Sequence, residues 1–281
     1  MKCNILKDSN YKNGFMLKGL SSLKDGHESK KDIILNKNKK PSWFICQWNS
    51  KYNFIEDGQI KIDDDSFEIK DETKTLYAKN GKVIFSLDTK NEYDHPRKAN
   101  EPWPHLLLEQ NIDNYPIKDL KSLRIKGKFE LLDFENYMPK GTQEGIHTSQ
   151  FVVVLVAKNV NKESQDYNHF VWIVFSIFDC RYRKSPLYCS QDHALPNGEF
   201  IYSFSSDDYM ENLLELHKPQ VIDFDLYKMI PNILAIAQKH GFLTNTKFED
   251  LALSGTNFGF EITGTFKSTI SVDDYQIIAE Y

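Results

Sequence analysis

Two glutamates in strand-like segments are the residues of this sequence best suited to acid–base chemistry. Glu109 follows the apolar run 106–108, and Glu261 lies in the alternating segment 257–264. Cleavage of a glycosidic bond needs two carboxyl groups: one protonates the leaving oxygen, and the other attacks the anomeric carbon or activates water. Glu109 and Glu261 are therefore the predicted catalytic pair. A retaining reaction needs about 5–5.5 Å between the groups and an inverting one about 6.5–9.5 Å, and the sequence leaves both open.

Side chains suited to a sugar accompany these glutamates in the segments 42–50, 91–110 and 257–264. A pyranose ring packs its apolar face on Trp or Tyr, and its hydroxyl groups pair with carboxylates, amides and Arg. Trp172 is a further candidate for an aromatic platform. A carbohydrate is thus the predicted partner, and the predicted binding residues are Trp48, Tyr93, Arg97, Trp103, His105, Gln110, Gln150 and Asn257.

Other reaction chemistries lack their motifs. The eight histidines form no H-x-H or H-E-x-x-H pattern, and the four cysteines show no zinc-like spacing, so no metal and no cofactor is expected. The sequence contains no G-x-G-x-x-G and no G-x-S-x-G segment, and the glycines near residue 259 are not followed by a P-loop lysine. Asp179, two residues before Arg181, is a third acidic candidate that we expect to form an ion pair fixing a loop.

Composition excludes some partners and suggests a compartment. The 35 basic and 40 acidic residues nearly balance, which argues against a nucleic-acid partner, and no apolar run approaches the roughly 18 residues of a membrane span. The first 20 residues do not resemble a secretory signal, so we expect a cytoplasmic protein, or a secreted one if a signal has been removed. We expect reduced cysteines, although Cys180 and Cys189 could pair in an oxidising environment.

The elements that must position these residues are predicted mainly as strands. Period-two alternation or short apolar runs mark strands at 42–50, 82–87, 123–131, 150–157, 169–179, 200–205, 257–264 and 274–281. One helix is expected at 226–240, with Asp225 as N-cap, Gly241 after its end, and Pro231 causing a kink or a late start. This pattern predicts an all-β fold, a single-domain antiparallel β-sandwich of the jelly-roll, concanavalin A-like type over 1–281, with 1–41 as a peripheral segment.

The order of elements in the last quarter, helix 226–240, the segment 241–264 and a closing strand to 281, resembles the concanavalin-like glucanase fold. It is most similar to the family-twelve glycoside hydrolases, in which a strand carries a short G-T-E-x-x-x-G segment whose Glu is the acid/base. Here Gly255 and Thr256 are followed by Asn257, and Glu261 comes four residues later. The nucleophile strand of that family has its nearest counterpart at 169–173, which holds no carboxylate. The resemblance implies the fold and, through Glu261, a carbohydrate-active protein.

Three functions are compatible with these patterns. The first is a glycoside hydrolase whose carboxylate pair, Glu109 and Glu261, lies in the concave groove of the sandwich. The second is a non-catalytic, lectin-like carbohydrate-binding protein on the same fold, which the missing family carboxylates favour. The third is a structural or interaction protein whose aromatic residues are only core, with Trp48 and Trp103 fully buried. Substrate, linkage and oligomeric state are not determined by these patterns.

Overall fold

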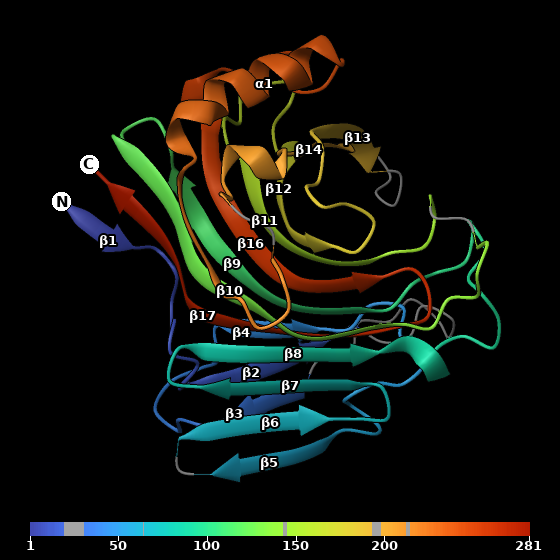
Figure 1. Ribbon diagram of the computed structural model, residues 1–281. Coiled ribbons are helices and arrows are strands. Elements are labelled where there is room, and N and C mark those ends of the chain that lie inside the picture. The colour runs from blue at the N-terminus through green and yellow to red at the C-terminus, as the bar shows by residue number, and fades with distance from the viewer. Residues whose placement is uncertain (20–30, 64, 143–144, 193–197, 212–213) are drawn as a thin grey trace.

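The computed structural model describes residues 1–281 apart from 20–30, 64, 143–144, 193–197 and 212–213, and consists of two packed β-sheets with one α-helix (Figure 1). The eight-stranded sheet contains, in spatial order, β15 (Gln220–Asp225), β10 (Ser122–Asn136), β17 (Phe266–Glu280), β8 (Lys82–Asp88), β7 (Lys74–Lys79), β6 (Ser66–Lys70) and β5 (Gln59–Asp63), and β1 (Lys2–Asn4) also pairs with β17. The nine-stranded sheet contains β13 (Tyr188–Asp192), β14 (Glu199–Ser203), β12 (Phe170–Asp179), β11 (Ser149–Asn159), β16 (Leu251–Ile262), β9 (His105–Pro116), β4 (Trp43–Cys46), β2 (Gly14–Lys18) and β3 (Lys31–Ile34).

Neighbouring strands are antiparallel, apart from the parallel pairs β12–β14 and β2–β4. The predicted all-β sandwich with one main helix is confirmed. The strands predicted between 82 and 281 correspond to β8, β10, β11, β12, β14, β16 and β17, and the segment 42–50 contains β4. Period-two alternation predicted them because each strand turns every second side chain into the shared core.

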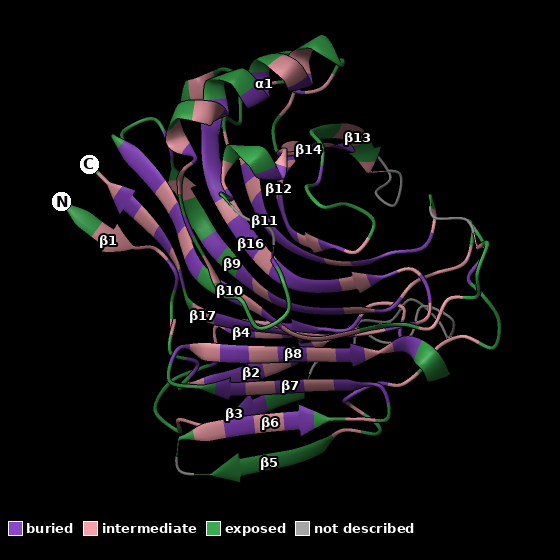
Figure 2. Cartoon of the chain, viewed as in Figure 1, coloured by how far each residue is buried: buried purple, intermediate pink, exposed green. Residues whose placement is uncertain are grey.

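The core lies between the two sheets and is rich in aromatic rings. Phe85 of the eight-stranded sheet makes edge-to-face contacts with Phe151 and Phe258 of the nine-stranded sheet, at centroid distances of 5.3 and 5.5 Å. Phe258 in turn meets the fully buried Trp43 at 5.8 Å. Each such ring contributes about 1.5–3 kcal/mol by burial. Figure 2 shows the buried positions alternating along the strands of both sheets. The buried core contains 16 of the 37 aromatic residues of the sequence, and others pack against it while partly exposed.

The helix begins after the start of the predicted range 226–240, which is the late start given as one of the two outcomes expected from Pro231. A 3-10 turn at Tyr227–Met229 precedes α1 (Ile230–Lys239), and Pro231 lies in the first turn of the helix, where its missing N–H costs nothing. Asp225 accepts the backbone N–H of Tyr227 and so holds the 3-10 turn, not the helix proper. Gly241, with φ +85°, follows the last turn, and Phe242 N–H bonds the carbonyl of Ala237 to close it.

The N-terminal segment is not peripheral, contrary to our expectation for 1–41. It supplies β1, β2 and β3, and Phe15 and Leu17 of β2 are completely buried. β2 lies between β3 and β4 within the nine-stranded sheet. Part of the segment 1–41, residues 20–30, lies outside the described residues. Its low hydrophobicity concealed that short strands flank it on both sides.

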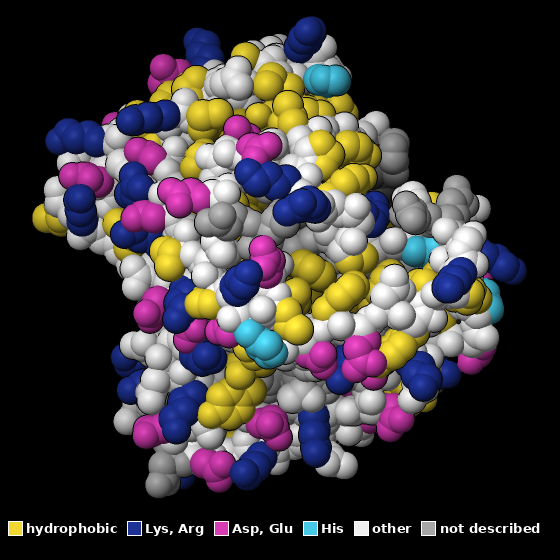
Figure 3. Space-filling view, viewed as in Figure 1, with side chains coloured by type: hydrophobic (Ala, Val, Ile, Leu, Met, Phe, Trp, Pro, Cys, Tyr) yellow, Lys and Arg dark blue, Asp and Glu magenta, His cyan; other side chains and the backbone are white. Residues whose placement is uncertain are grey.

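The surface carries both signs of charge. Figure 3 shows Lys and Arg interspersed with Asp and Glu over the face it displays, in keeping with the formal net charge of −5. Within the described ranges, no helix is long and apolar enough to span a bilayer.

Candidate functional site

The face of the nine-stranded sheet that is turned away from the core, here called the outer face, brings most of the predicted residues together. Strand pairing aligns its side chains in rows that cross the sheet. One row runs through Ser203, Val174, Val154, Asn257, Glu109 and Phe44. A second row, two positions further along the strands, runs through Ser176, Val152, Gly259, Leu107 and Cys46, and a third through Asp179, Gln150, Glu261 and His105.

Glu109 occupies the first row and is half-buried. Its carboxylate lies 3.1 Å from the ammonium group of Lys18 on β2, and the Cys46 thiol donates to it at 3.7 Å. Asn257 stands directly opposite on β16. The carboxylate and the amide of these two strands therefore face the same space, as the alternation of both segments predicted.

Glu261 occupies the third row, also half-buried. Gln150 on β11 donates its side-chain N–H to the carboxylate at 3.1 Å, and His105 Nε2 on β9 lies 3.9 Å from it. Gln150, Glu261 and His105 come from three adjacent strands. We call Glu109, Asn257, Gln150, Glu261 and His105 the polar strip.

Glu109 and Glu261 are too far apart to act as a pair. Asn257 lies opposite Glu109, and Glu261 is four residues further along β16. Four residues of strand span about 13 Å and adjacent strands are about 4.8 Å apart, so the two Cα atoms are about 14 Å apart. Side chains stand roughly perpendicular to a sheet and cannot close that gap. The register thus corrects the predicted catalytic pair, because both the retaining and the inverting spacing are shorter.

Between Asn257, which lies opposite Glu109, and Glu261, β16 presents backbone and no side chain on the outer face. Gly259 has φ +148°, and a Cβ atom placed there would lie 2.1 Å from the carbonyl oxygen of Leu106. Only glycine fits that close approach of two strands. The middle of the polar strip therefore carries no side chain on β16.

Asp179 lies in the same row as Glu261, two strands away, and is buried. One of its oxygens accepts the Thr148 hydroxyl at 2.8 Å, and Arg181 contacts both oxygens, the closer at 2.6 Å. This confirms the expected ion pair. With both oxygens occupied, Asp179 fixes the chain after β12 and is not available to a ligand.

The loop before β9 stacks three of the predicted residues. The Arg97 guanidinium lies over the Trp103 ring at 4.8 Å, and the Trp103 ring lies 5.7 Å from the imidazole of His105. Tyr93 donates its hydroxyl to the carbonyl of Ile262 at 3.2 Å. Burial raises the pKa of Tyr93 and lowers that of Arg97. This stack positions His105 at the end of the polar strip.

Two N–H groups in that loop are buried without an acceptor. Arg97 is 5% exposed, and its Nε finds no hydrogen-bond partner among the described residues; the same holds for Nε1 of Trp103. The Arg97 Nη2 donates to the carbonyl of Ala99 at 3.3 Å. Buried donors are normally paired, so two neighbouring ones mark a place where an outside acceptor would be favourable.

Gln110 does not belong to the site, which corrects the prediction for this residue. Its side chain is on the core side of β9, 1% exposed, between the buried Leu108 and Ile112. Both amide atoms bond the backbone of Lys7, at 2.7 and 2.8 Å. Gln110 thereby ties the N-terminal segment to β9. Alternation along 105–112 puts Gln110 on the same side as Leu106 and Leu108, although its polar amide had favoured the binding surface.

Partly exposed aromatic side chains flank the polar strip. On the β4 side, Phe44 and Trp48 each lie 5.4 Å from the Lys18 ammonium group. On the β12 side, Trp172 packs edge-to-face on Phe170 at 4.9 Å and bonds Asp192 through its indole N–H. Trp48 and Trp103 are not fully buried, so the reading of all these aromatics as core does not hold.

Tyr188 extends this second aromatic group and was not found from the sequence. It is 59% exposed and pairs with Ser203, the end of the Glu109 row. Its short strand, β13, has no alternating pattern that would have indicated which way the ring points. No group of three or more His, Cys, Asp or Glu residues within the described ranges is arranged to hold a metal ion.

Comparison with known proteins found similarity only at the level of three-dimensional structure. No protein-family model matches the chain, and no curated protein matches it. Among solved structures, it is similar to the family 12 xyloglucanase from Bacillus licheniformis, with 11% identity and TM-score 0.45 over 79% of this chain and 95% of that chain. The endoglucanase cel12A from Rhodothermus marinus has 10% identity and TM-score 0.42, over 76% and 92% of the two chains.

The xyloglucanase domain of NopAA, a type three effector from Sinorhizobium fredii, was solved in complex with cellobiose. It has 11% identity and TM-score 0.41, over 79% of this chain and 96% of that chain. The similarity thus extends well beyond the C-terminal quarter that carried the sequence resemblance. At about one identical residue in ten, no residue role transfers to this chain.

Proposed function

We propose that this protein binds a carbohydrate chain on the outer face of its nine-stranded sheet and does not cleave it. One observation carries the proposal: the polar strip lies on one continuous face between two groups of partly exposed aromatic rings. Phe44 and Trp48 form one group, and Phe170, Trp172 and Tyr188 form the other. Rings that receive the apolar face of a sugar and polar groups that receive its hydroxyls are thus adjacent.

The extent of this surface favours an oligosaccharide over a single sugar. Tyr188 on β13 and Phe44 on β4 are separated by six strand spacings, about 29 Å. Between them, Asn257 and Gln150 offer amide groups, while Glu109 and Glu261 offer acceptors for hydroxyl donors. The surface therefore provides both hydrogen-bonding roles to several sugar rings.

Hydrolysis is the competing function, and the spacing of the carboxylates argues against it. Glu109 and Glu261 stand two rows apart, and Asp179, the remaining carboxylate of these rows, has both oxygens occupied. No two of these three are free and at the distance that either mechanism requires. Binding requires no such pair.

The test is to screen the protein against an array of oligosaccharides and then to incubate any bound oligosaccharide with it for a day. We expect retention of the ligand and an unchanged chain length by chromatography. Release of shorter products that is abolished in both Glu109→Gln and Glu261→Gln would show hydrolysis instead. Absence of binding to every oligosaccharide of the array would reject a carbohydrate function altogether.

A further inference from the structure

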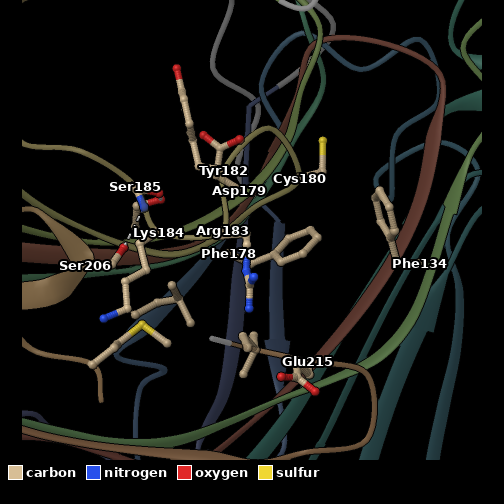
Figure 4. A pocket seen from close by; sticks show the side chains of 14 residues that line it. Phe134, Phe178, Asp179, Cys180, Tyr182, Arg183, Lys184, Ser185, Ser206 and Glu215 are labelled. Carbon is tan, nitrogen blue, oxygen red and sulfur yellow. Dashed lines mark hydrogen bonds between the residues drawn. The ribbon is translucent and has the colours of Figure 1, made fainter. Parts of the chain in front are cut away.

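A cavity opens away from the polar strip, at the side of the sandwich where β12 ends. Its volume is about 210 Å³. The walls come from the last residues of β12, the chain at 180–185, residues 206–210 and 214–215, and Phe134 of β10 (Figure 4). It therefore joins the edges of the two sheets and is separate from the proposed carbohydrate surface except at Ser176 and Asp179.

One wall of the cavity is apolar and aromatic. The rings of Phe134 and Phe178, one from each sheet, meet edge-to-face at 5.4 Å and 71°. Ile177, Met210 and Leu214 complete the wall. Aromatic rings prefer offset or edge-to-face neighbours, so a third ring fits favourably against such a pair.

The opposite wall is a set of linked hydroxyl groups. Ser185 donates its hydroxyl to Ser176 at 2.9 Å, and its backbone N–H donates to the Ser206 hydroxyl at 3.1 Å. All three serines are buried. Because these bonds join the end of β12 to two separate segments, the cavity is held open by hydrogen bonds within the protein.

One of the charged residues that line the cavity, a cation, forms no ion pair. Three of the four charged residues that line it already have an ion partner: Asp179 with Arg181, Lys184 with Asp207, and Glu215 with Lys218. Arg183 is exposed and has no ion pair and no hydrogen bond to any residue in the described ranges, although its charge helps to lower the pKa of Glu215. Figure 4 shows its guanidinium group between Phe178 and Glu215, inside the ring of lining side chains. A guanidinium group in this position can hold a carboxylate through two parallel hydrogen bonds.

We propose that this cavity binds a small carboxylic acid with an aromatic body. The carboxylate pairs with Arg183, and the ring packs against Phe134 and Phe178. The cavity volume limits the size of the ligand. It is below the roughly 300–1,000 Å³ of ordinary ligand pockets and admits about one ring with a short side chain. An oligosaccharide does not fit, so this site is independent of the proposed carbohydrate surface.

Titration calorimetry with three probes tests the proposal on the full chain. Phenylacetate has both the ring and the charge, phenylacetamide has the same shape without the charge, and acetate has the charge without the ring. We expect phenylacetate to bind at least tenfold more tightly than either. In Arg183→Gln this preference over phenylacetamide should disappear, while Lys162→Gln, the same change of charge in the exposed loop after β11, should retain it.

Cys180, which lines the cavity, reports the place of binding. Burial raises the pKa of its thiol, so labelling with iodoacetamide is done at alkaline pH and followed by mass spectrometry. Phenylacetate should slow labelling at Cys180 and leave Cys189, which is outside the lining, unaffected.

Three outcomes would each overturn the proposal: equal affinity for the acid and the amide, an unchanged preference in Arg183→Gln, or labelling of Cys180 that phenylacetate does not slow. Phenylacetamide binding retained by Arg183→Gln shows that this variant is folded.

Discussion

The same chemical groups occur in two clusters with opposite exposure. In the first, Asp71, Lys74 and Glu92 have side chains that are 0–2% exposed; the Lys74 ammonium lies 2.8 Å from Asp71 and 3.6 Å from Glu92. In the second, the polar strip, Glu109 and its partner Lys18 are 22% and 18% exposed, at 3.1 Å. The distances are similar, yet only the second cluster can be reached by a ligand.

The buried cluster joins separate segments of the chain. Lys74 also donates to the carbonyl of Tyr52 at 2.7 Å, and Glu92 accepts the Thr73 hydroxyl and the backbone N–H of Lys51, each at 2.6 Å. These bonds therefore attach two segments to the beginning of β7. One is the chain at 51–52, and the other is the start of the loop that contains Arg97 and Trp103. The comparison separates two uses of carboxylates: one cluster stabilises the fold, and the other presents acceptors at the surface.

The largest effect is expected from Lys74→Met. It leaves two carboxylates buried without a cation, and breaking a buried ion pair from one side costs about 3–5 kcal/mol of unfolding free energy. Urea denaturation measures this. Lys82→Met is the matched control, since Lys82 on the neighbouring strand pairs with Asp273 at 3.5 Å in an exposed position and should lose no more than about 1 kcal/mol. Equal losses in the two variants would contradict the distinction between the clusters.

Trp172→Ala should weaken binding of the carbohydrate found by the array about tenfold, the usual effect of removing an aromatic anchor worth more than about 1 kcal/mol. Its control is Tyr167→Ala, in the loop between β11 and β12, where the ring is 39% exposed and off the sheet. Titration calorimetry of both variants measures the change. A binding constant that is insensitive to Trp172 would place the ligand elsewhere.

Glu261→Gln should weaken carbohydrate binding about fivefold. The amide keeps the shape of the side chain but replaces a charged acceptor by a neutral one, which costs about 1 kcal/mol. Calorimetry with the same ligand gives the value. Tighter binding by this variant would show that Glu261 repels the ligand and does not accept its hydroxyl groups.

The smallest effect is expected from Glu109→Gln on stability. Its ion pair with Lys18 is partly exposed, so the unfolding free energy should change by no more than about 1 kcal/mol. Urea denaturation of Glu109→Gln and Lys74→Met under the same conditions compares the two losses directly. A loss of several kcal/mol would make Glu109 a structural residue like Glu92 and remove it from the proposed ligand surface.

Alternation along the chain predicted which side chains share a face. Trp43, Ile45 and Gln47 are buried while Phe44 and Trp48 are partly exposed, as the period of two requires; Cys46, on the same face as Phe44, is nonetheless buried. The same periodicity placed Glu109 and Asn257 on the outer face. It also placed Gln110 with the core residues, where its amide satisfies the backbone of Lys7. Where the pattern was short or polar, as in β13 and the strands before residue 35, alternation had too few residues to indicate a strand.

Pairing between strands that are far apart in the sequence decided which side chains lie close together. The sequence by itself determined a β-sandwich, its helix, and the set of polar and aromatic residues available for a ligand. Only the tertiary structure decided that Asn257, and not Glu261, lies opposite Glu109, and that Arg183 remains without an ion partner within the described ranges. The physical reason is that register between β9 and β16, about 150 residues apart in the chain, is set by how both strands pack on the shared core.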